Sequence, residues 1–288
     1  MFVPVYNYLN KSDISFFIQN ALLEDVGSGD HTSLSSIPSN ANNKAHLLVK
    51  DKGILAGVEL SKYIFEAVDP SLMLHFLMKD GEEMKKGDVV LEVNGSAQSI
   101  LKAERLVLNC MQRMSGIATY TKSLNTLIEG TGARLLDTRK TTPNFRIPEK
   151  WAVKIGGGTN HRFGLFDMIL LKDNHVDYAG GIKNAVQAAK QYLKNTGLSL
   201  DIELETRSLE EVEQALTEGG IKRIMLDNMP LEMLKAAVKL INKKTETEAS
   251  GGITEATIRN VALCGVDYIS VGALTHSVKS LDLSLKAY

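Results

Sequence analysis

Residues 202–241 read IELETRSLEEVEQALTEGGIKRIMLDNMPLEMLKAAVKLI, and they contain the same alternation twice. A short apolar run, Ile202–Leu204, ends in polar residues and precedes apolar positions at helical spacing, Leu209–Leu216. The order then repeats in Arg223–Leu226 and Leu231–Ile241. Strand patterns that alternate with helical patterns predict parallel strands covered by crossover helices.

The alternation continues in both directions, from about residue 133 to residue 271. The further strand patterns are Arg134–Leu136, Met168–Leu171, the run at Ala249 and Tyr268–Val271, and the further helical patterns are Ile182–Lys194 and Glu255–Leu263. About six strands can be counted, and the polar residues of interest follow them directly. Because chemistry in α/β barrels collects at the carboxyl ends of the strands, we expect an incomplete barrel of about six strands.

The amino-terminal part of the chain has a different pattern. Residues 14–26 have helical spacing and stop at a glycine-rich turn, whereas residues 44–95 contain short apolar runs around one helical segment, Leu60–Val68. Residues 99–129 contain few helix breakers and predict one or two long helices. We therefore expect an α/β protein with a small mixed-sheet domain before the barrel.

The composition is that of an ordinary globular enzyme. Of the 288 residues, 44% are hydrophobic and 23% are charged, and the formal net charge is −1. The sequence pI is near 6.6, which argues against a nucleic-acid partner bound through bulk positive charge. Any anion recognition must therefore come from basic residues that cluster locally.

The cysteines and the first residues bear on the cellular compartment. Cys110 and Cys264 lie far apart and form no pair motif, so we expect free thiols in a reducing compartment. Residues 1–13, MFVPVYNYLNKSD, lack a basic segment followed by a continuous apolar one, and no apolar run approaches the roughly 20 residues that span a bilayer. We expect a cytoplasmic protein without a membrane partner.

Basic residues are concentrated directly after the first barrel strand. Residues 139–172 contain seven Lys or Arg but only two acidic residues; the seven are Arg139, Lys140, Arg146, Lys150, Lys154, Arg162 and Lys172. A solvated basic face is the ordinary interpretation of a charge run. Here, however, DTRKTTP at 137–143 follows a predicted strand, and GGGTNHR at 156–162, which includes His161, is a glycine-rich turn. Arginine forks bind carboxylate or phosphate, and glycine lets backbone approach a ligand, so we favour a ligand with several negative charges.

Two acidic residues and two glycine-containing loops follow later strands. Glu205 and Asp227 stand where carboxylates can hold a divalent metal or accept hydrogen bonds from sugar hydroxyls, although either could instead cap the next helix. The loops SGGI at 250–253 and SVGA at 270–273 follow the last two predicted strands, where barrel enzymes bind phosphate. Ordinary turns are the alternative. No P-loop motif and no GxGxxG after a strand is present.

Taken together, these motifs resemble the quinolinate phosphoribosyltransferase family, in the right order from about residue 20 to residue 280. The motifs are ALLEDVGSGDHT (21–32), ER (104–105), SGIAT (115–119), DTRKTTP (137–143), GGGTNHR (156–162), LKDNH (171–175), ELE (203–205), LDN (226–228), SGG (250–252) and SVGALTHS (270–277). The departures are Asn144-Phe145 in place of the commoner Gly-Leu, Trp151 in place of Tyr and Lys154 in place of a frequent Arg, and they concern the shape of the pocket.

The resemblance implies an architecture. Residues 1–115 would form an N-terminal α/β open sandwich with a linking helix, residues 116–275 an incomplete α/β barrel, and residues 276–288 a segment returning to the N-terminal domain. It also implies a homodimer whose active sites straddle the interface, or a higher oligomer built from it.

The resemblance also implies roles for individual residues. Arg105 would reach the partner's pocket. The residues implied to bind quinolinate are Arg139, His161 and Arg162, with Lys140 and Lys172 as catalytic residues beside it. Glu205 and Asp227 are also implied to be catalytic, and they would bind the ribose of phosphoribosyl pyrophosphate and, directly or through water, Mg²⁺. The residues implied to bind its 5-phosphate are Ser250, Gly251, Gly252, Ser270 and Gly272.

The implied reaction transfers ribose 5-phosphate to quinolinate with loss of CO2 and pyrophosphate, giving nicotinate mononucleotide for NAD biosynthesis. Three alternatives stay open from the residues alone. A nicotinate-using transferase of related fold needs only one carboxylate clamp, which the extra Arg and His disfavour. A phosphate-binding aldolase or isomerase would use Lys140 or Lys172 as an amine, which borohydride trapping would reveal. A non-catalytic paralogue associated with molybdate transport would form no nucleotide.

Overall fold

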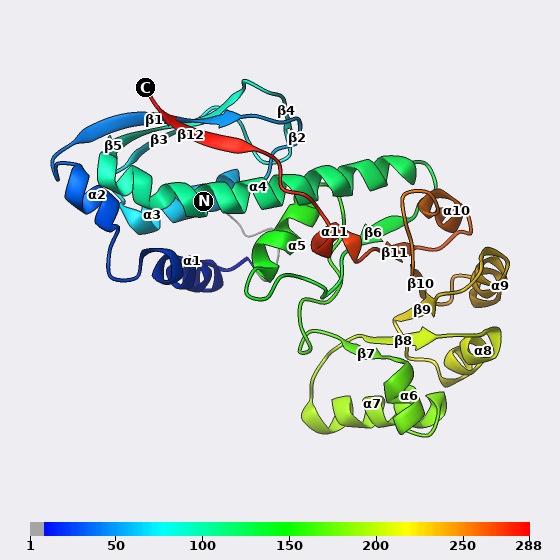
Figure 1. Cartoon of the computed structure of the whole chain (residues 1–288). Coiled ribbons are helices and arrows are strands. Elements are labelled where there is room, and N and C mark those ends of the chain that lie inside the picture. The colour runs from blue at the N-terminus through cyan, green and yellow to red at the C-terminus, as the bar shows by residue number, and fades with distance from the viewer. Residues whose placement is uncertain (1–8) are drawn as a thin grey trace. The chain divides into compact units, whose positions relative to one another are not determined.

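The computed structural model describes residues 9–288, and Figure 1 labels its helices and strands. Residues 1–8 lie outside the described residues. They are the first part of the segment 1–13, in which we expect no export signal. Among residues 9–288, no helix is both long and apolar enough to cross a membrane. The chain divides into two compact units: an amino-terminal unit (Met1–Lys122, Lys140–Gly157, Ala273–Tyr288) and a barrel unit (Ser123–Arg139, Gly158–Gly272).

The amino-terminal unit is built on an antiparallel sheet of order β12-β1-β5-β3, with β2 and β4 paired separately. Its elements are α1 (Lys11–Val26), α2 (His31–Ser36), β1 (Asn42–Val49), β2 (Gly53–Ile54), α3 (Val58–Val68), β3 (Met73–Phe76), β4 (Glu83–Met84), β5 (Val89–Ser96), most of α4 (Ala97–Leu127), α5 (Arg146–Ile155), α11 (Ala273–His276) and β12 (Leu283–Ala287). The helices expected at 14–26 and 60–68 are confirmed, and the segment 99–129 forms one helix.

Local sequence explains the ends and faces of these elements. The Asn10 side chain accepts a hydrogen bond from the Asp13 N–H and caps α1, which ends at Gly27 with a φ of 52°. In β1 the apolar residues Ala45, Leu47 and Val49 alternate with more exposed ones, so one face of the sheet is buried. Figure 1 shows this sheet lying over α3 and α4.

Polar residues of α4 attach the β2 segment to the helix. The Thr119 hydroxyl accepts a hydrogen bond from the Ile54 N–H at 2.7 Å, and the Ser115 hydroxyl accepts one from the Ala56 N–H at 3.0 Å. At Gly116 a Cβ atom would lie 2.2 Å from the Lys279 carbonyl oxygen, so only glycine lets the chain pass this close to the helix. The SGIAT motif at 115–119 is therefore a packing motif in this unit.

The barrel unit contains six parallel strands in the order β6-β11-β10-β9-β8-β7. Its elements are β6 (Arg134–Leu136), β7 (Ile169–Leu171), α6 (Asp173–Tyr178), α7 (Ile182–Thr196), β8 (Ile202–Thr206), α8 (Leu209–Glu218), β9 (Arg223–Asp227), α9 (Leu231–Ile241), β10 (Glu246–Ser250), α10 (Ile258–Ala262) and β11 (Tyr268–Ser270). No strand among the described residues pairs β6 with β7, so the sheet is not closed. This confirms the expected α/β class and incomplete six-stranded barrel.

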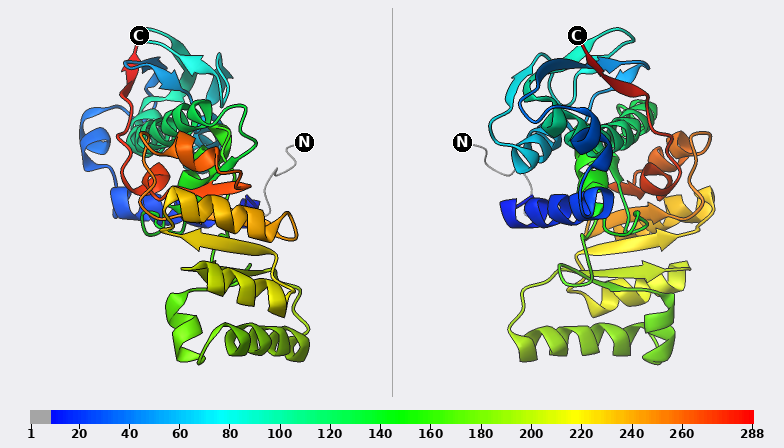
Figure 2. Two further views of the ribbon diagram at one scale, coloured as in Figure 1. Left: turned by 90° about the vertical axis from the view of Figure 1, so that its right-hand side faces the viewer. Right: turned by 60° about the vertical axis from the view of Figure 1, so that its left-hand side comes forward.

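Helices α7, α8 and α9 lie side by side along one face of these strands (Figure 2). Because side chains alternate along a strand, Ile202 and Leu204 share one face of β8, and Glu203 and Glu205 share the other. Burying each apolar side chain under the helices contributes about 1.5–3 kcal/mol. The other face, which α/β barrels commonly fill with branched apolar residues, here carries charged groups.

Candidate active site

Two carboxylates stand at the carboxyl ends of the neighbouring strands β8 and β9. Glu205 is 8% exposed, and Asp227 is half-buried. Burial raises the pKa of Glu205, the Lys172 ammonium lowers it and the Asp227 carboxylate raises it, so the three groups act on one another. The distance from Lys172 Nζ to Glu205 Oε2 is 3.8 Å. Carboxylate oxygens on neighbouring strand ends suit sugar hydroxyls or a hard divalent cation.

The loop after β10 is tied to the end of β9 through Asn228. Its backbone N–H donates to the Ser250 carbonyl at 2.9 Å, and its Nδ2 donates to Asp227 Oδ2 at 2.6 Å. Gly251 has a φ of +94°, and a Cβ there would lie 2.2 Å from Asn228 Oδ1. Asn228 therefore orients the Asp227 carboxylate and packs directly on the glycine loop.

The other loop predicted to bind phosphate follows β11. Ser270 is buried at the strand end, and the N–H of Val271 donates to the Leu136 carbonyl of β6 at 3.0 Å. Gly272 is the last residue of the barrel unit. Both glycine loops thus begin at the carboxyl ends of adjacent parallel strands, which is the edge that carries Glu205 and Asp227.

Two arginines lie close together after β6. Burial lowers the pKa of Arg162, and the positive charge of Arg139 lowers it further. Arg162 reaches only a carbonyl, that of Met168, at 3.4 Å, and the buried Nε of Arg139 has no hydrogen-bond partner among residues 9–288. Neighbouring guanidinium groups repel each other unless an anion lies between them, so this pair suits a ligand with more than one carboxylate.

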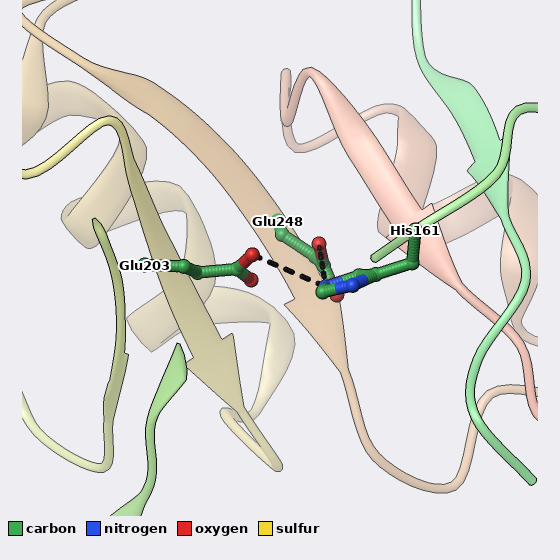
Figure 3. Close-up of side chains that lie close together, drawn as sticks. All are labelled: His161, Glu203 and Glu248. Atoms are coloured by element: carbon green, nitrogen blue, oxygen red, sulfur yellow. Dashed lines mark ion pairs between the residues drawn. The ribbon is translucent and has the colours of Figure 1, made fainter. Parts of the chain in front are cut away.

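His161 sits in a buried ionic cluster (Figure 3), which we call the interior cluster and which contains His161, Glu203, Arg223 and Glu248. His161 Nε2 lies 3.1 Å from Glu203 Oε2 and 3.5 Å from Glu248 Oε2. Arg223 lies 3.1 Å from Glu248 and 3.6 Å from Glu203. Both glutamate side chains are fully buried, so these charges are stable only because they compensate one another.

The backbone around His161 is held equally firmly. Its N–H donates to Asp137 Oδ1 at 2.8 Å, and Asn160 Nδ2 donates to the other oxygen of Asp137 at 2.5 Å. The N–H of Arg162 donates to His161 Nδ1 at 2.7 Å. Both ring nitrogens of His161 therefore face protein groups.

The two glutamates govern the protonation of His161. Burial lowers the pKa of His161, but its contacts with Glu203 and Glu248 outweigh burial and raise that pKa to about 9. Because Nδ1 accepts the Arg162 N–H, Nε2 is the ring nitrogen that faces Glu203 and Glu248. Burial raises the pKa of Glu203. Groups in such close contact titrate together instead of independently.

His161, Glu203 and Glu248 could also hold a metal ion on distance alone, since one ligand atom of each lies within 4.8 Å of the others. The same two carboxylate oxygens, however, already contact the Arg223 guanidinium. A cation thus already lies against both carboxylates. Glu205 and Asp227, which face Lys172 at the strand ends, fit a divalent ion better.

Arg105 and Lys140, two of the predicted site residues, belong to the amino-terminal unit. Arg105 lies on α4 with a side chain that is 65% exposed and pairs with Glu104 at 3.1 Å. Lys140 is exposed, and its carbonyl accepts a hydrogen bond from the Thr275 hydroxyl at 2.9 Å. Part of the basic run, namely Arg146, Lys150 and Lys154, forms one side of α5 in this unit, where Lys150 is buried.

The barrel unit by itself brings together the other predicted residues, which are Arg139, His161, Arg162, Lys172, Glu205, Asp227, Ser250, Gly251, Gly252, Ser270 and Gly272. Sequence reasoning missed Glu203, Arg223 and Glu248 as members of a cluster. A signal was present, since each is a charged residue inside a strand that is otherwise apolar and buried. The prediction that His161 contacts the substrate stays a prediction; in the structure its ring nitrogens face Arg162, Glu203 and Glu248.

Comparison with known proteins covers nearly the whole chain. The family model described as "Quinolinate phosphoribosyl transferase, N-terminal domain" matches residues 30–115, and its C-terminal counterpart matches residues 117–286. The chain is 51% identical to the Arabidopsis thaliana protein "Nicotinate-nucleotide pyrophosphorylase [carboxylating], chloroplastic", over 95% of this chain and 82% of that one. A probable nicotinate-nucleotide pyrophosphorylase from Bacillus subtilis is 41% identical over 96% and 94%. The crystal structure of NadC from Streptococcus pyogenes superposes with a TM-score of 0.90 at 39% identity, covering 98% of both chains.

Proposed function

Since the chain belongs to the quinolinate phosphoribosyltransferase family, we propose that the polar groups at the carboxyl edge of its barrel strands bind the two substrates of that family's reaction. The chain is an enzyme, a pentosyltransferase of NAD biosynthesis. It transfers ribose 5-phosphate from phosphoribosyl pyrophosphate to quinolinate and releases pyrophosphate and CO2. The product is nicotinate mononucleotide.

The observation that supports the substrate assignment best is the pair Arg139 and Arg162. Quinolinate carries carboxylates on adjacent ring carbons, and each planar guanidinium can bind a carboxylate through two parallel hydrogen bonds. Burial and then the positive charge of Arg139 lower the pKa of Arg162, so a dianion relieves a repulsion already present in the protein. Nicotinate, with one carboxylate, would leave one of these charges uncompensated.

The phosphoribosyl end of the site would be formed by the strand ends of β8 to β11. Glu205 and Asp227 would accept hydrogen bonds from the ribose hydroxyls. The backbone N–H groups of the loops at Ser250–Gly252 and Ser270–Gly272 would bind the 5-phosphate, as in other phosphate-binding barrels. The open space at Gly252, where an added Cβ would meet nothing within 4 Å, supports this because it leaves room for a phosphate beside the backbone.

The chemistry requires charge compensation more than a protein nucleophile. The ring nitrogen of quinolinate forms a bond to C1 of the sugar as the bond to pyrophosphate breaks, with Lys140 and Lys172 opposing the negative charge. The alkylated nitrogen is cationic, so when CO2 leaves, the electron pair at ring carbon C2 is stabilised as an ylide. That carbon then takes a proton from water. No lysine imine is needed at any point.

A divalent cation, which we propose to be Mg²⁺, fits Glu205 and Asp227. After burial, the Asp227 carboxylate also raises the pKa of Glu205, and a bound cation would relieve this repulsion. When bound, the ion neutralises negative charge on the pyrophosphate. The chain's part is to hold it beside the ribose hydroxyls.

We further propose that the enzyme works as a homodimer, or as a higher oligomer of such dimers, in which Arg105 enters the partner's site. Its exposed position on α4 supports this, because a guanidinium with one surface carboxylate partner is free to bind an additional anion. We expect the enzyme in the cytoplasm, although relatives named chloroplastic and mitochondrial occur in plants.

The proposal is tested by incubating purified protein with quinolinate, phosphoribosyl pyrophosphate and Mg²⁺ and measuring nicotinate mononucleotide and CO2. We expect both products in equal amounts, and no product when nicotinate replaces quinolinate. Efficient use of nicotinate would contradict the two-carboxylate assignment. Trapping of a lysine adduct by borohydride would contradict the absence of an imine.

A further inference from the structure

The interior cluster adjoins Arg162, on which Glu203 acts electrostatically, and its side chains are buried. Both ring nitrogens of His161 contact protein groups, and Glu203 and Glu248 are fully buried. Burying two carboxylates near a site that binds a dianion has an electrostatic cost, because like charges repel at short range. The charge of the cluster therefore does not explain how it could favour substrate binding.

The geometry of the cluster provides an explanation. The Arg162 N–H donates to His161 Nδ1, so the orientation of the imidazole ring sets the direction of the backbone at Arg162. The ring in turn is oriented from its other side by Glu203 and Glu248. A chain of contacts therefore runs from strands β8 and β10, through His161, to the residue whose guanidinium lies beside Arg139.

We propose that Glu203 and Glu248 are positioning residues for quinolinate: they clamp His161, which holds the backbone of Arg162 and thereby places the arginine pair that binds the two carboxylates. This inference rests on the proposed function of Arg139 and Arg162. It assigns His161 an additional role, which is to orient its neighbour Arg162. Arg223 completes the clamp by bridging both carboxylates.

The chain offers a matched control on the same strand. Glu246 also pairs with Arg223, at 3.4 Å, and lies two residues before Glu248, but it makes no contact with His161. Glu246→Gln and Glu248→Gln therefore remove the same charge, next to the same arginine. Only the second change loosens His161.

An electrostatic role and a positioning role of these glutamates predict opposite changes in quinolinate affinity. If Glu203 and Glu248 acted on the substrate only through their field, replacing either with Gln would remove a negative charge and tighten quinolinate binding. If they position Arg162, binding should weaken, because a misplacement of about 1 Å in a clamp can cost up to about 10²-fold. The direction of the effect thus separates the two roles.

The experiment measures quinolinate affinity by titration calorimetry and the KM for each substrate, with thermal unfolding as a check on folding. We expect Glu203→Gln and Glu248→Gln each to raise the Kd of quinolinate about tenfold. In these two variants we expect the KM for phosphoribosyl pyrophosphate to stay within about twofold of that of the unsubstituted protein. In Glu246→Gln we expect both the Kd of quinolinate and the KM for phosphoribosyl pyrophosphate to stay within about twofold as well. In a His161→Gln background, Glu248→Gln should have no additional effect on quinolinate binding.

Several outcomes would overturn the inference. These are quinolinate binding that is unchanged or tighter in both glutamine variants, equal losses for both substrates, or an undiminished effect of Glu248→Gln without His161. If Glu203→Gln does not fold, Glu248→Gln alone and Glu248→Gln combined with His161→Gln still test the inference. An unsubstituted protein that neither binds quinolinate nor forms nucleotide would instead refute the proposed function.

Discussion

At the scale of single residues, the barrel interior departs from ordinary core chemistry. Ionised side chains are rarely fully buried, because taking them out of water costs several kcal/mol each unless partners compensate. Glu203 and Glu248 meet this condition through Arg223 and His161. Removing one partner leaves another uncompensated, so we expect substitutions in this cluster to affect stability as well as binding.

The raised pKa of His161 makes folding stability depend on pH. The pKa of His161 is about 9 in the folded protein against an ordinary value of 6.5, so its stabilisation is complete below about pH 6.5 and is lost as the pH rises through about 9. We expect the free energy of unfolding of the unsubstituted protein to fall relative to that of His161→Gln from about pH 6 to about pH 10, measured with denaturant. Parallel pH curves for the two proteins would contradict this.

Arg139 provides a direct test of the arginine pair. Replacing Arg139 with Ala removes charge-assisted hydrogen bonds, worth about 1.5–3 kcal/mol, so the KM and Kd for quinolinate should rise roughly 10- to 100-fold. The matched control is Arg207→Ala, because Arg207 is an exposed arginine of the same unit paired with Asp177 and Glu211. Unchanged constants in Arg139→Ala would refute the assignment.

The two cysteines are predicted to be inert in the folded protein. Burial raises the pKa of Cys110 to about 12 and also raises the pKa of Cys264, and both thiols are buried. Only the thiolate reacts with disulfide reagents, so at about pH 8 we expect labelling about 10²-fold slower than in denaturant. Rapid labelling of Cys110 without denaturant would show that α4 opens locally.

At the scale of elements, the loop after β10 permits a comparison between two glycines. Gly251 and Gly252 both have positive φ, at +94° and +59°, so Ala is strained at either position by roughly 1–2 kcal/mol. Only at Gly251 would the added Cβ collide with Asn228. We expect Gly251→Ala to raise the KM for phosphoribosyl pyrophosphate more than Gly252→Ala does, with a smaller effect on quinolinate. Equal effects on both constants would argue against phosphate binding at this loop.

The barrel strands could be predicted because each is a short apolar run next to a helical pattern, as in Ile202–Leu204 before Leu209–Leu216. Glu205 and Asp227 could be predicted for the same reason, since they follow strands directly. The interior cluster could not, because which glutamate meets which arginine depends on strand register. In the structure Glu203 lies opposite Arg223, and Glu248 lies opposite Tyr268.

Other elements were missed for identifiable reasons. Helix α5 lies inside the basic segment, where sequence analysis predicted no helix, and it contains Pro148 and ends at Gly156. Strand β12 is a short alternating segment whose partner β1 is more than 200 residues earlier, so no local pattern announces the pairing. Asn144 has a φ of 62°, a left-handed conformation that asparagine tolerates, which explains how it can stand where the family commonly has glycine.

At the scale of the whole molecule, the grouping of segments depends on long-range contacts. Residues 140–157 follow the first barrel strand in sequence, yet they group with the amino-terminal unit. Within that unit the buried Glu149 pairs with Arg113 of α4 at 3.0 Å, and Phe145 packs against Phe17 of α1. The expected domain boundaries at residues 115 and 275 stay predictions, because contacts of this kind cut across any division made along the chain.

The shared-site homodimer can be tested by complementation between two impaired variants, assayed at a quinolinate concentration well below the KM of either variant. If Arg105 completes the partner's site and Arg139 acts in its own subunit's site, a mixed dimer of Arg105→Ala and Arg139→Ala contains one site with both defects and one site with neither. Random mixing makes half of the dimers mixed, so roughly a quarter of all sites should be intact and activity should return to about that level. Activity is measured after the variants are unfolded and refolded together, with each variant refolded alone as the control. Tagging one variant detects the mixed dimers. If mixed dimers form but are no more active than the variants refolded alone, then Arg105 and Arg139 serve the same subunit's site or Arg105 has no part in it.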